Sequence, residues 1–378
     1  MKIFLFDMDG VLLESRGYHL ALQETVRQMA NALGFGNATL SPDDIAAFEA
    51  GGITSEWDEA AISTALLLEL VWSEEPERRL PGSLAIPASP SPNPHSAPDF
   101  NNLAHSLSTP DLLPLPPLER AESIFLATGR HTPAQEQLLR TLIHEARTVA
   151  HSLTHRTFQE LVLGSKEFAR TYGLPARLDS DSYLLKYDLS NLSNIESARL
   201  MDWISTPGHA AAVVTSRPSV PPAGTFSTPE AELGIKLVGL EGIPILGWGG
   251  MCWLGQQRQV NPQTFLKPSP VHALAGLRMT LGEDQEAALN EAVKLVETGL
   301  AGTEWGQFEG MQVCIFEDTP AGIKSLQAAK DVLGKAGIEI EVMNYGIAKK
   351  PVKLQALKAL DATIIPSLME ALDLALKN

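Results

Sequence analysis

The sequence begins with a short apolar segment, Lys2–Phe6, which runs directly into Asp7-Met8-Asp9-Gly10. An apolar run of this length that ends in acidic residues is typical of a buried β-strand leading into a polar loop. Helical patterns separate most of the further segments of this kind, which lie at 210–214, 243–246, 312–316, 338–343 and 362–365. Strands that alternate with helices predict a parallel sheet with helices on both faces and ligands at the carboxyl ends of its strands. We therefore expect an α/β fold with a Rossmann-like core.

The first two expected strands are separated by about two hundred residues, far more than a parallel crossover requires. We therefore expect a core at residues 1–15 and 205–378 and an inserted domain at 16–204. A capping box that begins at Thr132, followed by apolar residues at helical spacing, indicates that the insertion is mainly helical.

Residues 74–119 of the insertion contain many prolines with serine and asparagine between them. Proline removes backbone donors, and the segment offers few side chains that pack well, so we expect it to be extended and flexible. A plain linker is favoured over a docking segment for a proline-binding domain.

Composition narrows the class of protein. A hydrophobic content of 44% and a charged content of 20% are those of a globular protein, and no apolar run is long enough to cross a membrane. The formal net charge of -16, without a cluster of basic residues, argues against a nucleic-acid partner. Only two cysteines, Cys252 and Cys314, are present and no export signal is evident, so we expect a cytoplasmic protein.

Two segments place polar side chains directly after apolar runs. Asp7 and Asp9 follow the first expected strand, where two carboxylates two residues apart can share one cation while pointing in different directions. Thr215 and Ser216 follow the run at 210–214, where a hydroxyl and backbone N–H groups could hold phosphate oxygens.

Two later segments add charged residues. Lys267 comes just before Ser269 and Pro270, which are typical of a helix start, so the lysine lies near a positive helix end that suits an anion. Glu317 and Asp318 end another apolar run and can complete a magnesium shell made of oxygen ligands.

In order and spacing, the four segments resemble the motifs of the haloacid dehalogenase superfamily, matched here by Asp7 and Asp9, Thr215, Lys267, and Glu317 and Asp318. The resemblance covers residues 1–15 and about 205–378, and it implies that the insertion is a helical cap domain. Within the cap it is weaker. Tyr18-His19 and Gly52-Ile53-Thr54 resemble a Tyr-His pair and a Gly-x-Ser/Thr loop of the phosphoglycolate phosphatase and beta-phosphoglucomutase branches.

These cap residues have competing interpretations. The resemblance makes His19, Gly52 and Thr54 candidate substrate residues. A helix histidine packed at a domain hinge explains His19 equally well, and a plain turn between helices explains Gly52 and Thr54.

The resemblance implies a magnesium-dependent phosphatase that hydrolyses a small phosphate monoester, a phosphorylated metabolite, through an aspartyl-phosphate. Asp7 would attack phosphorus, and Asp9 would act as general acid and then as general base. Lys267 would balance the carboxylates and, with Thr215 and Ser216, bind the transferring phosphoryl group.

Magnesium is the cofactor that this interpretation requires. Its ligands would come from Asp7, the backbone carbonyl of Asp9, and Asp318, with Glu317 completing the set. Arg217, next to the phosphate segment, would either contact the substrate or pair with an acid.

Two alternatives use the same residues. A phosphomutase would form the same aspartyl-phosphate and return the phosphoryl group to a sugar. A non-catalytic scaffold would keep the fold and use the proline-rich segment for docking. A dehalogenase is disfavoured, because that chemistry dispenses with the second aspartate and with the metal ligands.

Overall fold

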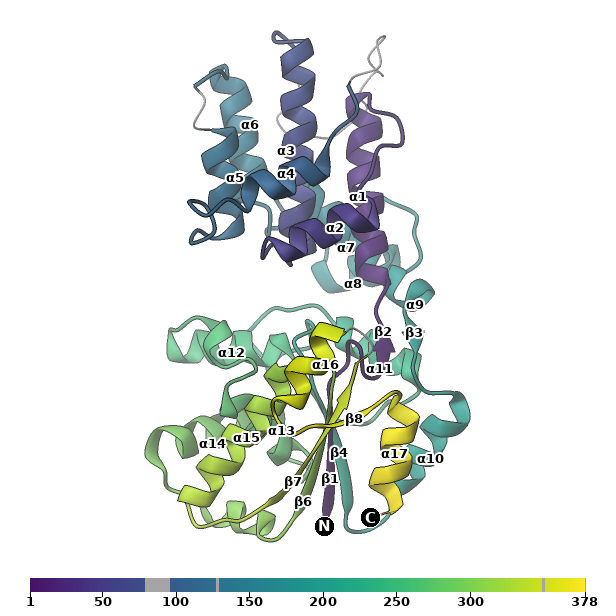
Figure 1. Cartoon of the computed structure of the whole chain (residues 1–378), viewed down its shortest axis with the longest axis vertical. Helices are drawn as coiled ribbons and strands as arrows, with labels where there is room; N and C mark the ends of the chain where they lie inside the picture. The colour runs from purple at the N-terminus through teal and green to yellow at the C-terminus, as the bar shows by residue number, and fades with distance from the viewer. Residues whose placement is uncertain (79–95, 127–128, 349–350, 378) are drawn as a thin grey trace. The chain divides into compact units, whose positions relative to one another are not determined.

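The computed structural model describes residues 1–78, 96–126, 129–348 and 351–377 (Figure 1). The chain forms two compact units, which we name the core unit, Met1–Ser15 with Asp188–Asn378, and the helical unit, Arg16–Tyr187. The core unit therefore starts again at Asp188 and not at the expected residue 205. The reason is that α10 (Asn194–Ile204) packs on the core, where Leu200 is buried and Ser197 Oγ donates to Val238 O over 2.6 Å.

The core unit contains a sheet of six parallel strands in the order β5-β4-β1-β6-β7-β8. The strands are β1 (Lys2–Phe6), β4 (His209–Val214), β5 (Ile245–Leu246), β6 (Gln312–Glu317), β7 (Glu341–Ile347) and β8 (Thr363–Ile365). The expected parallel α/β sheet is confirmed, although β7 begins three residues later than the strand predicted at 338–343. Phe6 of β1 pairs with Val213 and with Phe316, so β1, β4 and β6 end at the same edge of the sheet.

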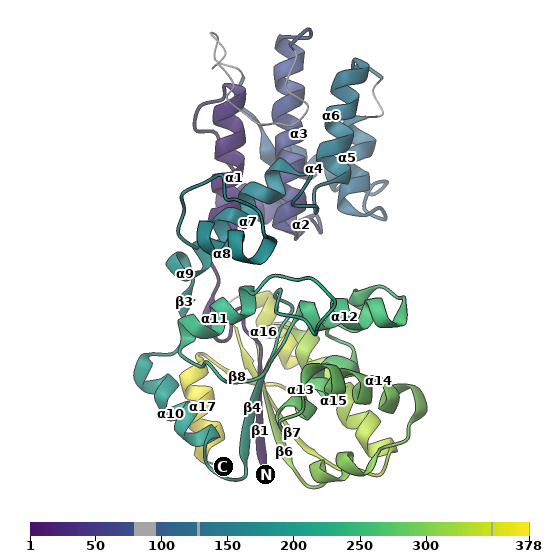
Figure 2. The ribbon, with the colours of Figure 1, turned by 180° about the vertical axis from the view of Figure 1, so that it is seen from behind.

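Helices cover both faces of this sheet (Figures 1 and 2). One face carries Ile3 and Leu5 of β1 and packs against α12 (Trp248–Arg258), α13 (Pro270–Met279), α14 (Gln285–Thr298) and α15 (Pro320–Lys335). The opposite face carries Phe4 and Phe6 and packs against α10, α11 (Glu230–Val238) and α17 (Leu368–Lys377). Because successive side chains of a strand point to opposite faces, β1 is buried on both sides. The remaining core helix, α16 (Pro351–Lys358), lies between β7 and β8 in the sequence.

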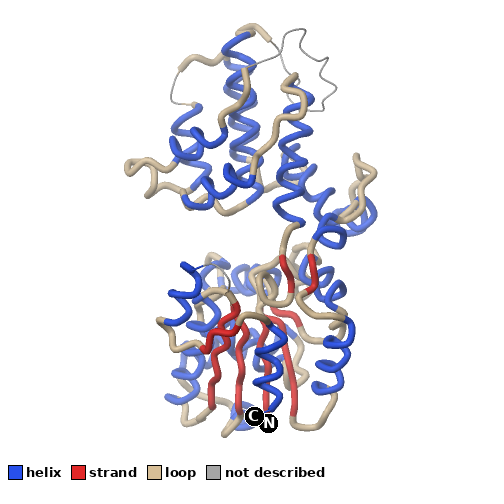
Figure 3. Tube along the Cα trace, turned by 45° about the vertical axis from the view of Figure 1, so that its right-hand side comes forward, coloured by secondary structure: helices blue, strands red, loops and turns tan. Residues whose placement is uncertain are grey.

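A second, small sheet lies where the chain leaves and re-enters the core unit. Its antiparallel strands are β2 (Leu13–Glu14) and β3 (Leu189–Ser190), and they pair Leu13 with Ser190 and Glu14 with Leu189. Figure 3 shows both sheets as red segments in a chain that is otherwise mostly helix and loop.

The helical unit contains nine described helices: α1 (Gly17–Leu33), α2 (Pro42–Ala50), α3 (Glu56–Glu74), α4 (Phe100–Leu107), α5 (Pro117–Phe125), α6 (Pro133–His144), α7 (Leu153–Leu163), α8 (Ser165–Tyr172) and α9 (Tyr183–Tyr187). The capping box predicted at Thr132 is confirmed, because the Thr132 and Gln135 side chains each accept from the other's backbone N–H. None of the helices described in either unit is long and apolar enough to cross a lipid bilayer.

The proline-rich segment 74–119 differs from the expectation over its second half. Residues 79–95 lie outside the described residues. At residues 100–107 the prediction of an extended segment is wrong, since α4 forms there, capped by the Asp99 side chain and with Phe100 and Leu107 buried. The expectation gave too much weight to the prolines and too little to an eight-residue stretch that has none.

Candidate functional site

Three carboxylates meet at the carboxyl ends of β1 and β6. Asp7 directly follows β1, and its backbone N–H donates to Phe316 O over 3.0 Å. Glu317 is the last residue of β6, and Asp318 follows it. All three side chains are buried, and each contributes an oxygen that lies within 4.8 Å of the others. We call Asp7, Glu317 and Asp318 the carboxylate cluster.

The buried side chain of Lys267 neutralises part of the negative charge of this cluster. Its Nζ lies 2.9 Å from Asp7 Oδ1 and 2.6 Å from Glu317 Oε1, and only 5% of its side chain is exposed. Burial works to lower the pKa of Lys267, but the charges of Asp7 and Glu317 outweigh it and raise the pKa. The lysine therefore remains an ammonium ion.

The backbone around Lys267 is fixed by His272 on α13. Lys267 N–H donates to His272 Nδ1 over 3.3 Å, so the ring proton lies on Nε2, which donates to Leu246 O over 3.2 Å. Burial, with the charge of Lys267, lowers the pKa of His272 to about 3, and the ring is neutral. The peptide bond between Lys267 and Pro268 is cis.

Glycines allow the acids to pack closely. A Cβ on Gly322, in the first turn of α15, would overlap Glu317 Oε1, and a Cβ on Gly10 would overlap Asp318 Oδ2. Burial, followed by the charge of Asp7, raises the pKa of Glu317 to about 8 against the opposing effect of Lys267. Burial also raises the pKa of Asp318, although an ion pair with Lys353 opposes it. The cluster is therefore short of positive charge.

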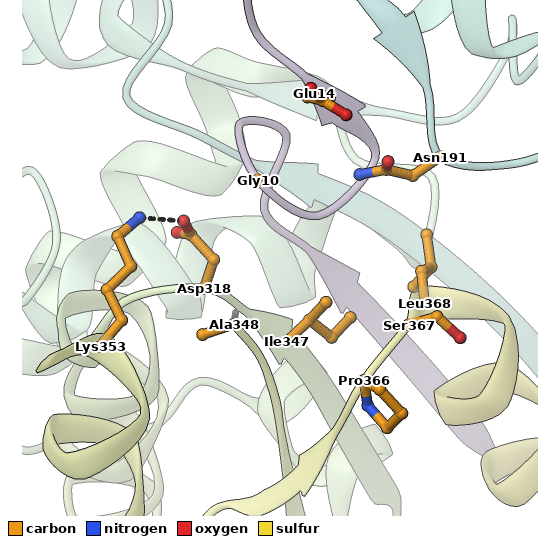
Figure 4. A pocket seen from close by; sticks show the side chains of 10 residues that line it. All are labelled: Gly10, Glu14, Asn191, Asp318, Ile347, Ala348, Lys353, Pro366, Ser367 and Leu368. Carbon is orange, nitrogen blue, oxygen red and sulfur yellow. Dashed lines mark hydrogen bonds and ion pairs between the residues drawn. The ribbon is translucent and has the colours of Figure 1, made fainter. Parts of the chain in front are cut away.

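Lys353, which the sequence analysis did not single out, reaches the cluster from α16. Its Nζ forms an ion pair with Asp318 Oδ2, drawn as a dashed line in Figure 4. Both residues line a cavity of about 340 Å³ whose remaining walls are Gly10, Glu14, Asn191, Ile347, Ala348, Pro366, Ser367 and Leu368. A signal for Lys353 exists in the sequence, since it follows the end of a strand that adjoins β6.

Asp9 lies apart from the carboxylate cluster. Its oxygens accept from Arg217 Nε over 2.8 and 3.0 Å, and Ser15 Oγ donates to Oδ1. Partial burial works to raise the pKa of Asp9, but the charge and hydrogen bonds of Arg217 outweigh it, so the pKa is lowered. Asp9 was expected to offer its backbone carbonyl to the metal and its side chain as acid and base, and the structure shows that side chain held by an arginine. Of the two interpretations of Arg217, the structure shows pairing with an acid.

The two hydroxyl residues after β4 differ in their exposure to solvent. Thr215 is buried; its N–H donates to Leu246 O over 2.9 Å, and its Oγ1 accepts from Arg217 N–H over 3.2 Å. Ser216 is exposed. Thr215 therefore shapes the turn that carries Arg217, and Ser216 offers its hydroxyl to solvent.

The candidate residues of the helical unit lie on its surface. His19 on α1 is half exposed and its Nε2 lies 3.5 Å from Glu49 Oε1. Gly52, with φ of 77°, and the exposed Thr54 form the turn between α2 and α3. The buried Arg120, which the sequence analysis missed, supports this turn by donating to Gly51 O over 2.6 Å.

Comparisons with known proteins bear on the fold alone. No protein-family model and no curated protein matches the chain. One solved structure, an X-ray structure of a Northeast Structural Genomics Consortium target, is similar with a TM-score of 0.61 and 16% sequence identity. The similarity covers 99% of this chain and 98% of the other. It supports an α/β architecture with a parallel sheet and a large helical region.

Proposed function

We propose that the chain is a magnesium-dependent phosphatase of the haloacid dehalogenase type that hydrolyses a small phosphate monoester. The observation that carries this proposal is the contact of Lys267 with Asp7 and Glu317, beside Asp318, at the carboxyl ends of two adjacent parallel strands. Three segments that are far apart in sequence supply these groups. A buried cluster of this kind is costly to fold, which favours a functional role.

The donor set fits magnesium. The carboxylate cluster offers only oxygen ligands, which Mg²⁺ prefers, and the raised pKa values of Glu317 and Asp318 show that a further cation there would be stabilising. Asp7 and Asp318 would hold the ion with the backbone carbonyl of Asp9, and Glu317 would lie beside it as the partner of Lys267. When bound, the ion would neutralise charge on the phosphoryl oxygens.

The residues of the core unit would then divide the reaction between them. An Asp7 oxygen attacks phosphorus and the bond from phosphorus to the ester oxygen breaks. Because Arg217 lowers the pKa of Asp9, the Asp9 carboxylate first takes up a proton from solvent and then gives that proton to the departing oxygen. In the second step Asp9 takes a proton from water, whose oxygen displaces Asp7 and releases inorganic phosphate. Lys267 holds Asp7 in place and stabilises the charge of the transferring group.

A phosphatase panel with and without Mg²⁺ tests the proposal. We expect Mg²⁺-dependent release of inorganic phosphate from a member of a panel of sugar phosphates, phosphoglycolate, nucleotides and aryl phosphates. Asp7→Asn should lower turnover by about 10³-fold or more, because the nucleophile is lost. Asp331→Asn, at an exposed aspartate on α15, is the matched control and should leave turnover unchanged.

Two results would contradict the proposal: inactivity of the wild type on the whole panel, which favours a scaffold, or retention of most activity by Asp7→Asn. Phosphate released in proportion to substrate lost distinguishes hydrolysis from a phosphomutase, which would yield an isomeric sugar phosphate.

A further inference from the structure

We propose that Arg217 and Asp188 are a positioning pair that fixes the carboxylate of Asp9 and links it to both chain connections of the core unit; this inference rests on the proposed function. The pair would set how well Asp9 can protonate the leaving group. Neither residue needs to contact the substrate for this role.

The guanidinium of Arg217 is buried, with 2% of its side chain exposed, and it bridges two acids. Its Nη2 lies 2.6 Å from Asp9 Oδ1 and 2.8 Å from Asp188 Oδ2, while its Nε donates to both oxygens of Asp9. The Asp188 side chain is 1% exposed. A planar guanidinium held by two carboxylates has little freedom to rotate, so Asp188 fixes the direction from which Arg217 meets Asp9.

The partners of Arg217 are the residues at which the chain leaves and re-enters the core unit. Ser15 is the last residue of the first core segment and Asp188 is the first residue of the second. Arg217 Nη2 donates to Ser15 Oγ over 3.0 Å, and Ser15 Oγ donates to Asp9. One buried side chain therefore contacts both connections and the candidate acid.

Backbone hydrogen bonds tie the same segments together. The ribbon of β2, which ends just before Ser15, and β3, which begins just after Asp188, joins the two segments. Asn191 extends it by donating to Leu12 O and Val11 O, each over 2.9 Å. The loop that carries Asp9 is closed by Gly10 N–H, which donates to Leu13 O over 2.8 Å. A displacement of either connection would therefore change the position of Asp9.

The consequence for catalysis depends on the leaving group. An alkoxide must be protonated as it departs, whereas a nitrophenolate departs without a proton. A small misplacement of an acid slows proton transfer strongly. Misplacing Asp9 should therefore slow phosphoryl transfer from an alkyl phosphate far more than transfer from nitrophenyl phosphate.

The test is rapid-quench measurement of phosphoenzyme formation by Asp188→Asn with both kinds of substrate in the presence of Mg²⁺. This isolates the first half-reaction, in which Asp9 acts as acid. We expect a loss of about tenfold to a hundredfold with the alkyl phosphate and of less than about threefold with nitrophenyl phosphate. Asp373→Asn, which breaks the exposed pair of Arg199 and Asp373 in the same unit, is the matched control and should change neither rate.

Ser15→Ala provides a second variant if Asp188→Asn does not fold, since it removes a hydroxyl and leaves both charges in place. It should show the same selectivity with a loss of about threefold. Equal losses on both substrates, or no loss on either, would overturn the positioning role while leaving the phosphatase intact. A wild-type protein that forms no phosphoenzyme from any substrate would overturn the proposed function and the positioning role together.

Discussion

Both units bury carboxylates, but they surround them differently. In the core unit the buried acids have lysines beside them, Lys267 at Asp7 and Glu317 and Lys353 at Asp318. Charges of both signs converge there on one edge of a sheet that is otherwise apolar. This is an arrangement that can bind ions and change its charge during a reaction.

In the helical unit, Glu59 on α3 is buried without such a cation. Its Oε2 has no hydrogen-bond partner among the described residues, and the acids Glu56, Glu49 and Asp58 act on it. Burial, reinforced by these acids, raises the pKa of Glu59 to about 9. Asp58 is neutralised by Arg147, whose nitrogens lie 3.0 and 2.7 Å from its oxygens.

The difference shows that burial alone does not determine the charge of an acid, because neighbouring lysines also act on it. Burial raises the pKa of Glu59 to about 9 with no lysine in the described part of the chain to oppose it, whereas in the carboxylate cluster Lys267 and Lys353 oppose the rise in the pKa values of Glu317 and Asp318. Replacing Lys267 should therefore lower the free energy of unfolding far more than replacing Glu59 with its neutral isostere, glutamine.

The largest effect is expected from Lys267→Met. It leaves Asp7 and Glu317 buried without their ammonium partner, which should lower the free energy of unfolding by about 3 kcal/mol. Phosphoryl transfer should fall by about 10³-fold or more, because the group that orients Asp7 is lost. Urea unfolding and the phosphatase assay measure the two effects. Lys294→Met, at an exposed lysine, is the control and should leave both quantities unchanged. If Lys267→Met did not lower the free energy of unfolding, the buried acids of the core unit would not depend on their lysine, and the contrast with Glu59 would be lost.

Glu59→Gln should instead change how stability depends on pH. The folded-state pKa of about 9 lies above the ordinary value of 4.5, so the folded protein holds the proton more tightly than the unfolded chain. The stability that this provides is complete below about pH 4.5 and is lost as the pH rises toward 9.

As the pH rises from 5.5 to 7.5, the free energy of unfolding of Glu59→Gln should therefore increase by about 2 kcal/mol relative to that of the wild type. The reason is that one proton changes this free energy by at most about 1.4 kcal/mol for each pH unit. Urea unfolding at the two pH values measures this. Glu119→Gln, at an exposed residue of the same unit, should follow the wild type. If Glu59→Gln did so as well, Glu59 would be ionised in the folded protein.

Sequence reasoning reached the core site because a parallel sheet brings strand ends together. Each of Asp7, Glu317 and Lys267 lies at or near the end of a recognisable strand or the start of a helix. The parallel order of the strands then brings these ends to the same edge of the sheet. The same reasoning could not place Arg217 on Asp9, since that contact depends on Asp188, which no pattern in the sequence marks.

The helical unit gave a weaker signal for physical reasons. Its helices and the Thr132 cap were predictable from spacing, but helix packing does not gather residues at fixed positions of the sequence. Glu59 lies in a helix that is buried on nearly all sides, and an acid there looks like any solvated glutamate. Residues 100–107 form a helix within a proline-rich segment because the tertiary contacts of Phe100 and Leu107 outweigh composition.

The smallest effect is expected from Lys353→Met. This variant tests whether Mg²⁺ can replace the ammonium group of Lys353 at Asp318. Lys353 has 40% of its side chain exposed, so its pair with Asp318 contributes little stability, about 1 kcal/mol or less. If Mg²⁺ binds the same carboxylate, the ammonium must leave Asp318 first. Removing it should then lower the Kd for Mg²⁺ by up to about fivefold, the fold-change that corresponds to that energy.

Isothermal titration of the purified protein with MgCl₂ measures this without any substrate. Lys358→Met, at an exposed lysine on the same helix, should bind as the wild type does. A Kd that is unchanged or higher in Lys353→Met would mean that Lys353 and the ion do not compete for Asp318. Lys353 would then stay in place as a second permanent counter-charge like Lys267, and the core cluster would differ from Glu59 by its fixed lysines alone.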